Sequence, residues 1–301
     1  MTTPGWRSDL EERGYTHIPR VFSAAECASI RAAGARIVAV SAGHSFEERF
    51  GNVRFFMGAA PDATLRSAIW CALLDPELER LRRDPRLFAY LRPLLGDSVR
   101  QVTNQLHFKL PGSRASFPLH SDRSSRDRAQ GGEIRNLDRS FYQTAIVAER
   151  MGRHNGGVYF LPGSHRWSPG TPYAAHVDAR RRPEEDFAGA MPEGCEAIEA
   201  DEGDLLLWHG DAVHGSAVSH DPTSARLLYL NGYARAEDCL RGYFAWIDVA
   251  PVPMPPIGVP VLVYGPPDLD AFRLDEGEAL RARVDALRGA TTPPSPATSL
   301  R

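Results

Sequence analysis

The chain has 301 residues, of which 43% are hydrophobic and 24% are charged, a composition typical of globular proteins that excludes collagen-like, low-complexity and wholly disordered chains. The formal net charge of −3 gives no basic excess for binding nucleic acid or an anionic membrane. No apolar run approaches the roughly 18–20 residues of a membrane span, and the polar segment Met1–Arg13 lacks the apolar core of a secretory signal. We therefore expect a soluble, cytoplasmic protein with no nucleic-acid or membrane partner.

The first hundred residues are predicted to be mainly helical. Ser23 and Glu26 have the spacing of a capping box, and the run Ala24–Val40 contains few helix breakers. Two further helices are predicted to begin where an aspartate that can cap the helix precedes a proline suited to the first turn. These dipeptides are Asp75-Pro76 and Asp84-Pro85.

From about Gln101 the pattern changes to short runs typical of strands, separated by Gly, Pro, Asp and Ser. Several short strands without intervening helices indicate an antiparallel sandwich or barrel. The predicted strands are Gln101–Leu110, Phe141–Ala148, Gly157–Leu161, Cys195–Ala200, Asp204–His209, Val213–Ser219 and Arg226–Tyr233.

We predict one domain over residues 1–289, followed by a disordered tail over residues 290–301. Its parts are a helical region (about 1–100), a β core (about 101–235) and a C-terminal packing segment (236–289) that includes a proline-rich stretch. Two long irregular segments interrupt the β core, and segments of this kind are usually binding loops or lids. They are Arg123–Ser140 and Arg166–Gly194.

The cysteines are far apart and form neither a CxxC pair nor a cluster with histidines, unlike a zinc knuckle or a disulfide scaffold. We expect buried thiols in a reducing cytosol. The four residues are Cys27, Cys71, Cys195 and Cys239.

His120 and Asp122 form an HxD pair. If this segment is a strand, the two side chains point the same way and can occupy adjacent corners of a metal octahedron. The pair alone is common by chance, but a second histidine well down the chain, on another strand of the same sandwich, supplies a third corner; His209 and His214 are the candidates. Two histidines and one carboxylate on one face leave open positions, as in non-heme Fe(II) oxygenases and unlike a closed zinc site.

Arg226 begins a predicted strand and is followed by two leucines. A guanidinium buried there is costly without a partner anion, and it holds a carboxylate through two parallel hydrogen bonds that lysine matches poorly. The residue suits the far carboxylate of a dicarboxylate co-substrate whose keto acid end chelates iron. The alternative is an ordinary ion pair with Asp221 or a neighbour.

Four segments, in this order, resemble the phytanoyl-CoA dioxygenase (PhyH) family of Fe(II)/2-oxoglutarate-dependent oxygenases over most of residues 8–235. They read LEERGYTHIPRVFSAAECASIRAAGARI, QLHFKLPGS…FPLHSD, NGGVYFLPGSHR and GDLLLWHGDAVHGS…R. The resemblance implies a mainly β fold with flanking helices, in which a helical N-terminal region precedes a double-stranded β-helix, the cupin-like jelly roll.

The resemblance also implies the cofactors and their contacts. The implied Fe(II) ligands are His120, Asp122 and His214. The implied 2-oxoglutarate contacts are Lys109, Ser216 and Arg226. His209 lies five residues before His214 and can exchange roles with it, but Ser216 and Arg226 are in register only with His214. Because Asp122 is present, halogenation is disfavoured.

Candidate substrate contacts come from the strand before the HxD pair, from the arginine-rich loop, from a Pro-Gly turn and from the C-terminal segment. His107 shares strand parity with Lys109, although a core role for this histidine is equally consistent with the pattern. The candidates are His107, Arg123, Arg126, Arg135, His165 and Trp246.

The function that follows is oxidation of an unactivated C–H bond in a small polar metabolite, by hydroxylation or oxidative cyclisation in natural-product tailoring. Fe(II), 2-oxoglutarate and O2 are the expected cofactors, succinate and CO2 the expected products, and ascorbate the expected reductant in vitro. Two alternatives stay open: a jelly-roll metalloenzyme that needs no 2-oxoglutarate, and a non-catalytic binding module of the same fold.

Overall fold

The structure is a computed structural model. It describes residues 3–41, 49–50, 53–58, 64–122, 140–167, 193–235, 238 and 243–246, and every structural statement below concerns these residues. The arginine-rich segment 123–139, residues 168–192 of the second predicted loop, the proline-rich stretch 250–267 and the predicted tail 290–301 lie outside them.

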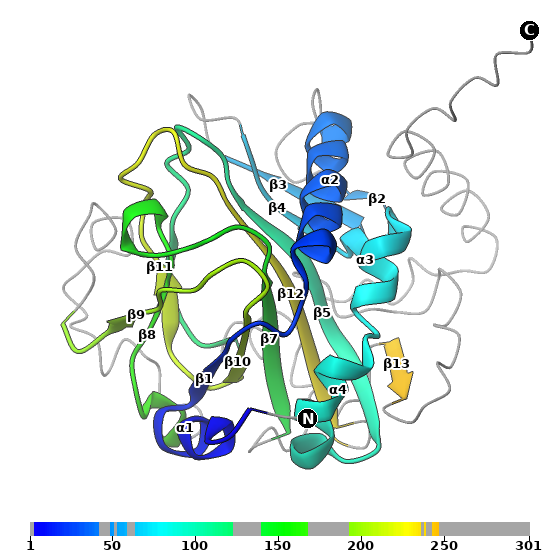
Figure 1. Cartoon of the computed structure of the whole chain (residues 1–301), viewed down its shortest axis with the longest axis vertical. Coiled ribbons are helices and arrows are strands. Elements are labelled where there is room, and N and C mark those ends of the chain that lie inside the picture. The colour runs from blue at the N-terminus through cyan, green and yellow to red at the C-terminus, as the bar shows by residue number, and fades with distance from the viewer. Residues whose placement is uncertain are drawn as a thin grey trace, which may run out of the picture.

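A large antiparallel sheet forms the centre of the fold (Figure 1). Its strand order is β1-β10-β7-β12-β5-β4-β3-β2, and β13 also pairs with β5. The strands are β1 (Tyr15–Ile18), β2 (Arg49–Phe50), β3 (Val53–Met57), β4 (Leu65–Ile69), β5 (Ser98–Lys109), β7 (Phe141–Val147), β10 (Leu205–His209), β12 (Arg226–Arg235) and β13 (Tyr243–Trp246).

A smaller antiparallel sheet has the order β6-β11-β8-β9. Its strands are β6 (Phe117–His120), β8 (Val158–Phe160), β9 (Glu196–Ala197) and β11 (His214–Ser216). Apolar side chains of β8 join those of β7, β10 and β12 in one buried cluster, so the two sheets pack face to face. Together with the helices before the core, this confirms the predicted jelly roll with an N-terminal helical region.

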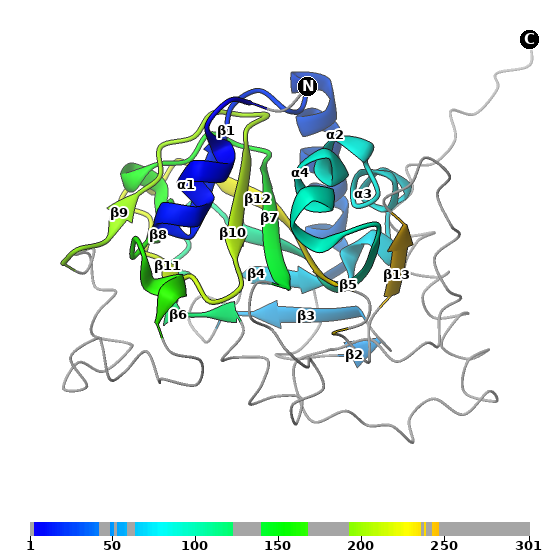
Figure 2. The same ribbon diagram turned by 90° about the horizontal axis from the view of Figure 1, so that it is seen from below.

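Helices cover the opposite face of the large sheet (Figure 2). They are α1 (Trp6–Arg13) beside β1, and α2 (Ala24–Ser41), α3 (Pro76–Leu81) and α4 (Pro85–Leu95) over the central strands. Three short 3-10 turns lie elsewhere in the chain order: η1 (Cys71–Leu73) precedes α3, η2 (Arg153–Asn155) precedes β8 and η3 (Ser164–Arg166) follows β8. The caps act as predicted, because Asp75 accepts hydrogen bonds from the backbone of α3 and Asp84 from that of α4. No helix among the described residues is long and apolar enough to cross a bilayer.

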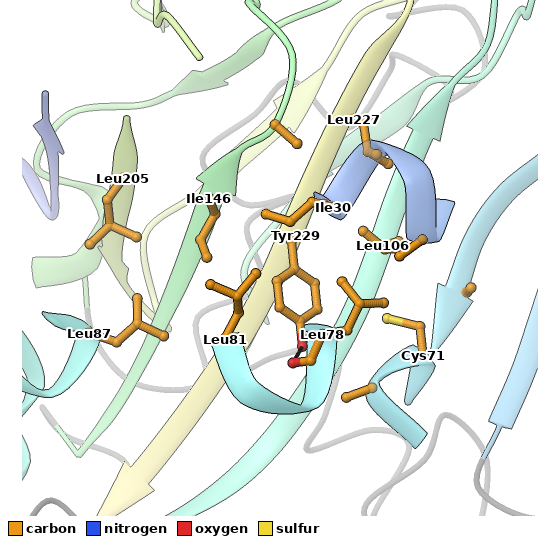
Figure 3. Packing of buried hydrophobic residues seen from close by; sticks show 14 of the residues in the cluster. Ile30, Cys71, Leu78, Leu81, Leu87, Leu106, Ile146, Leu205, Leu227 and Tyr229 are labelled. Atoms are coloured by element: carbon orange, nitrogen blue, oxygen red, sulfur yellow. Dashed lines mark hydrogen bonds between the residues drawn. The ribbon is translucent and has the colours of Figure 1, made fainter. Parts of the chain in front are cut away.

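The core between helices and sheet is mainly apolar, and the phenol of Tyr229 within it both donates and accepts a hydrogen bond (Figure 3). Tyr229 of β12 donates to the carbonyl of Leu78 in α3 at 2.6 Å and accepts from Asn104 of β5 at 2.7 Å. Helix α2 approaches the sheet closely at Gly34, where a Cβ atom would lie 2.9 Å from Leu227 Cδ2. These contacts fix the positions of β12 and β5, the two strands that carry the buried cations described below.

One part of the sequence prediction was incomplete. Within the first hundred residues, predicted to be mainly helical, strands β2, β3 and β4 extend the large sheet beyond β5. Strand β4 reads LRSAI, too short and too irregular for a clear period-2 pattern, and it acquires its extended conformation by pairing with β5.

The capping box at the start of α2 is also an ion pair with α4, and it gives a prediction for stability. Glu26 binds the backbone of Ser23 at 2.9 Å and the guanidinium of Arg86 at 2.5 Å. The Arg86 hydrogen bond is the main reason that the pKa of Glu26 is lowered from 4.5 to about 2.

We expect Glu26→Gln to lower the free energy of unfolding by about 1–2 kcal/mol near neutral pH, since a carboxylate with a lowered pKa stabilises the folded state only while it is ionised. The loss should be full above pH 4.5 and shrink as the pH falls toward 2. Urea denaturation across this range measures it, with the exposed Glu11→Gln as control. An equal effect at all pH values would contradict the assignment.

Candidate metal centre

The pairing of β6 with β11 brings together the first residues of the site. His120 at the end of β6 lies directly opposite His214 at the start of β11, and the two imidazole rings are 4.4 Å apart. Asp122 follows two residues after β6. The ligand atoms of these three residues all lie within 4.8 Å of one another, the one such group of three His, Cys, Asp or Glu side chains among the described residues.

Backbone carbonyls orient both imidazoles. The Nδ1 atom of His120 lies 2.6 Å from the carbonyl of Pro118, and that of His214 lies 2.9 Å from the carbonyl of Ala212. A carbonyl only accepts, so each Nδ1 carries the proton and each Nε2 presents a lone pair. This tautomer, fixed by a hydrogen bond on the far nitrogen, is typical of histidine metal ligands.

Burial favours the neutral form of the His214 imidazole. Burial, followed by the neighbouring His120, lowers the pKa of His214 to about 4. Its Nε2 lies 3.7 Å from Oδ2 of Asp122, which is also buried. Two imidazole nitrogens and one carboxylate oxygen could therefore occupy one face of a metal octahedron. This is the donor set of a facial triad, which leaves the other coordination positions of the metal open.

Sequence reasoning did not select Trp208, which contacts the triad. Its indole Nε1 donates to Asp122 Oδ2 at 2.9 Å. The residue lies in β10, six positions before His214, and alternation places it on the inner face with Leu206. The available signal was an indole in an otherwise aliphatic buried strand, because a buried Trp N–H needs an acceptor.

The same alternation distinguishes His209 from His214, the two histidines that the sequence left as alternative metal ligands. His209 has the parity of Leu205 and Leu207, whose side chains face the helices. Its ring packs against Tyr142 at 5.1 Å and His165 at 5.7 Å. His209 therefore lies on the face of β10 opposite to Trp208, outside the group that can hold a metal.

A second group of polar residues lies deeper between the sheets. The register of β12 and β5 places Arg226 opposite Lys109, and each side chain is only 1% exposed. The Nε and Nη2 atoms of Arg226 and the hydroxyl of Ser216 in β11 are buried without a hydrogen-bond partner. Lys109 donates to the carbonyl of Ala217. These residues leave buried donors free for an anion.

Burial is the main electrostatic effect on both cations. It lowers the pKa of Arg226 to about 10, opposed by the charge of Glu149. It also lowers the pKa of Lys109, and the charge of Arg226 lowers it further. Two like charges at facing strand positions repel each other, and a bound carboxylate relieves the repulsion.

The NGG segment has a steric role beside these cations. Gly156 has φ +69°, and a Cβ atom there would lie 2.5 Å from both Lys109 Nζ and the carbonyl of Ala217. Asn155 holds the turn, since its amide donates to the carbonyls of Arg150 and Ala225. Glycine is therefore required where the backbone approaches the ammonium group.

The structure places His107 between the two groups. It lies opposite Leu228, its Nε2 is 2.9 Å from Gln105 Oε1, and its ring stacks on Phe117. Burial and then the charge of Arg226 lower its pKa to about 3, with smaller effects from the triad. The side chain is therefore neutral and within electrostatic reach of both groups.

The structure does not bring the other predicted substrate contacts to the triad or to the Arg226 group among the residues that it describes. His165 lies against Gly14, and its Nε2 is 3.2 Å from the carbonyl of Glu11, so the described contacts join η3 to α1. Trp246 ends β13 opposite Ser98. The arginines lie outside the described residues: Arg123, Arg126 and Arg135.

Comparisons with known proteins agree on one family. The family model described as phytanoyl-CoA dioxygenase (PhyH) matches residues 10–224. A relative named probable alpha-ketoglutarate-dependent hypophosphite dioxygenase, from Stutzerimonas stutzeri, is 27% identical over 243 residues, covering 75% of this chain and 76% of the relative.

Solved structures share the fold. EctD from S. alaskensis with 2-oxoglutarate and 5-hydroxyectoine has a TM-score of 0.60 at 23% identity, covering 78% of this chain and 77% of EctD. The non-heme alpha-ketoglutarate-dependent epimerase SnoN, from nogalamycin biosynthesis, has a TM-score of 0.57 at 21% identity, covering 87% of this chain and 91% of SnoN.

The opposite orientations of two nearby histidines give a prediction. We expect His214→Ala to weaken binding of Co(II), a coloured probe for divalent metals, by at least about 100-fold, because it removes a ligand and not only an outer contact. His209→Ala, the matched control on the other face of the sheet, should bind Co(II) like the unmodified chain. Anaerobic titration followed by visible absorption measures both, and the reverse result would refute the triad.

Proposed function

This chain belongs to the phytanoyl-CoA dioxygenase family, and from that premise we propose that it oxidises an unactivated C–H bond of a small polar metabolite. The chain is a non-heme dioxygenase that depends on iron and 2-oxoglutarate. The products of the proposed reaction are the hydroxylated or ring-closed metabolite, succinate and CO2, and tailoring of a natural product is the proposed role.

The residues of the candidate centre fit Fe(II). His120 and His214 offer Nε2 lone pairs held by hydrogen bonds on Nδ1, and Asp122 offers a carboxylate oxygen. Mixed nitrogen and oxygen donors on one face suit ferrous iron and leave positions for a co-substrate and O2. We therefore propose these three residues as the iron ligands.

The observation that carries the proposal is that the Nε and Nη2 atoms of Arg226 are buried without a hydrogen-bond partner. A buried arginine without an anion is unfavourable, and a carboxylate restores its lost hydrogen bonds in bidentate geometry. The hydroxyl of Ser216 and the ammonium of Lys109 lie among the same strands and can supply further donors. This group fits the distal carboxylate of 2-oxoglutarate.

When bound, Fe(II) and 2-oxoglutarate would supply the oxidising power of the reaction, with O2 as the oxidant. The residues of the chain supply binding and orientation. Arg226 and Lys109 orient the co-substrate from its far end, and the aliphatic wall of Leu228, Leu230 and Val147 excludes water from the space between the sheets.

Polar groups on the inner face support a polar substrate. Gln143 of β7 lies beside Trp208, and both atoms of its amide are buried without a partner. Gln105 and His107 form a second polar pair on β5. The relative from Stutzerimonas stutzeri is named for hypophosphite, and EctD binds 5-hydroxyectoine, and both compounds are small and polar.

Removal of the guanidinium tests the co-substrate site. We expect Arg226→Met to weaken 2-oxoglutarate binding by roughly 10–100-fold, because charge-assisted hydrogen bonds contribute about 1.5–3 kcal/mol. The melting temperature without ligand should not fall, since the change removes a buried charge whose Nε and Nη2 atoms lack hydrogen-bond partners. Anaerobic titration with Mn(II) and 2-oxoglutarate measures the first effect and calorimetry the second.

Arg235→Met is the matched control, because Arg235 ends the same strand and pairs with Asp238. It should leave 2-oxoglutarate binding unchanged. If Arg226→Met binds 2-oxoglutarate as tightly as the unmodified chain, Arg226 is not its anchor. If the unmodified chain itself shows no binding of 2-oxoglutarate, the alternative of a metalloenzyme that needs no 2-oxoglutarate is favoured.

A turnover screen tests the reaction itself. We expect succinate to form above the background rate with at least one compound of a panel of small polar metabolites, in the presence of Fe(II), ascorbate, O2 and 2-oxoglutarate. Succinate and the oxidised product should appear in equal amounts when oxidation is coupled. Absence of succinate with every compound, from a chain that binds metal and 2-oxoglutarate, would favour a non-catalytic binding module.

A further inference from the structure

One side chain contacts two of the three triad residues. The indole Nε1 of Trp208 donates to Asp122 Oδ2 at 2.9 Å, and the indole ring packs edge-to-face against the imidazole of His214, with centroids 5.3 Å apart. Trp208 is 2% exposed. It therefore joins a carboxylate 86 residues away in sequence to a histidine on another sheet.

Aromatic packing fixes the position of the indole. Phe160 of β8 contacts Trp208 with ring centroids 5.7 Å apart and stacks against His214 at 5.5 Å. Phe160 is itself held by Tyr15 of β1, which stacks on it with ring centroids 4.3 Å apart. Since rings from both sheets surround it, the indole presents its N–H in one direction.

Asp122 needs such a contact more than the histidines do. His120 and His214 belong to paired strands, and their backbones are held by the ladder. Asp122 follows the end of β6, outside the ladder. A hydrogen bond from the indole to one carboxylate oxygen fixes the plane of the carboxylate while lone pairs remain for a metal.

We propose that Trp208 is a positioning residue for the metal, which sets the orientation of the Asp122 carboxylate through the indole N–H and supports the His214 ring through packing. The inference rests on the proposed function, because it takes the triad as the iron site. It adds a residue that neither binds the metal nor touches the co-substrate group around Arg226.

The two contributions of Trp208 can be separated. Phenylalanine at position 208 keeps an aromatic ring beside His214 and Phe160 but cannot donate to Asp122. A benzothienyl analogue of tryptophan, incorporated at this position alone, keeps the size and shape of the indole and replaces only the N–H by sulfur. The analogue therefore tests the hydrogen bond without a change in packing.

We expect Trp208→Phe to weaken Co(II) binding by about 10–100-fold, the range found when the hydrogen-bond partner of a metal ligand is removed. The benzothienyl analogue should show a loss of the same order. The visible absorption bands of bound Co(II) should shift in both proteins, because a released carboxylate changes the coordination. A protein altered only in packing would keep those bands.

Trp6→Phe is the matched control, because Trp6 lies in the cluster between helices and sheet and packs against Tyr90. It should leave Co(II) affinity and spectrum unchanged. Melting of the metal-free proteins shows whether each variant folds, and the analogue decides the question if Trp208→Phe does not fold.

Co(II) affinity and spectrum equal to those of the unmodified chain, in the folded Phe variant or in the analogue, would overturn the inference and leave the proposed function intact. Failure of the unmodified chain to bind Co(II) would overturn both.

Discussion

The interior of this protein is organised around the buried guanidinium of Arg226, whose Nε and Nη2 atoms have no hydrogen-bond partner within the part of the chain that the structure describes. Backbone pairing of β12 with β5 places Arg226 opposite Lys109, so neither residue can move away from the other without breaking the central pair of strands. Both pKa values are lowered by burial. An anion with two oxygens at this place would relieve the desolvation of the guanidinium, so the binding proposed above would also stabilise the fold.

The strand register also separates the chemical environments along the inner face. Along β12, Arg226, Leu228, Leu230 and Gly232 share the inner face of the sheet. Arg226 and Gly232 are roughly 20 Å apart at about 3.3 Å per residue. Gly232 lies beside Gln143, which in turn lies beside Trp208. A cationic end, an aliphatic middle and a polar end therefore follow one another in a single strand direction. This arrangement supports separate places for a dicarboxylate and a polar substrate.

The sequence was sufficient for features that depend on local pattern. Asp-Pro dipeptides and the Ser23–Glu26 pair defined helix starts, and alternation defined the inner face of the long strands. Strand β4 could not be predicted because its conformation depends on pairing with β5. The contact of Trp208 with Asp122 could not be predicted either, since it needs the relative position of two sheets.

The unpartnered polar atoms have a common meaning. A buried hydroxyl, amide or guanidinium without a partner costs on the order of 1–3 kcal/mol, so chains rarely keep several in one place. Here Ser216, Arg226 and Gln143 all belong to strands that line the space between the sheets. The ligands of the proposed function would supply the missing hydrogen-bond partners. The free protein is less stable because these atoms lack partners, and a ligand that supplies the partners would recover that free energy on binding. Because the atoms have fixed positions, a ligand with the wrong arrangement of polar groups would recover less of it, which gives specificity as well as affinity.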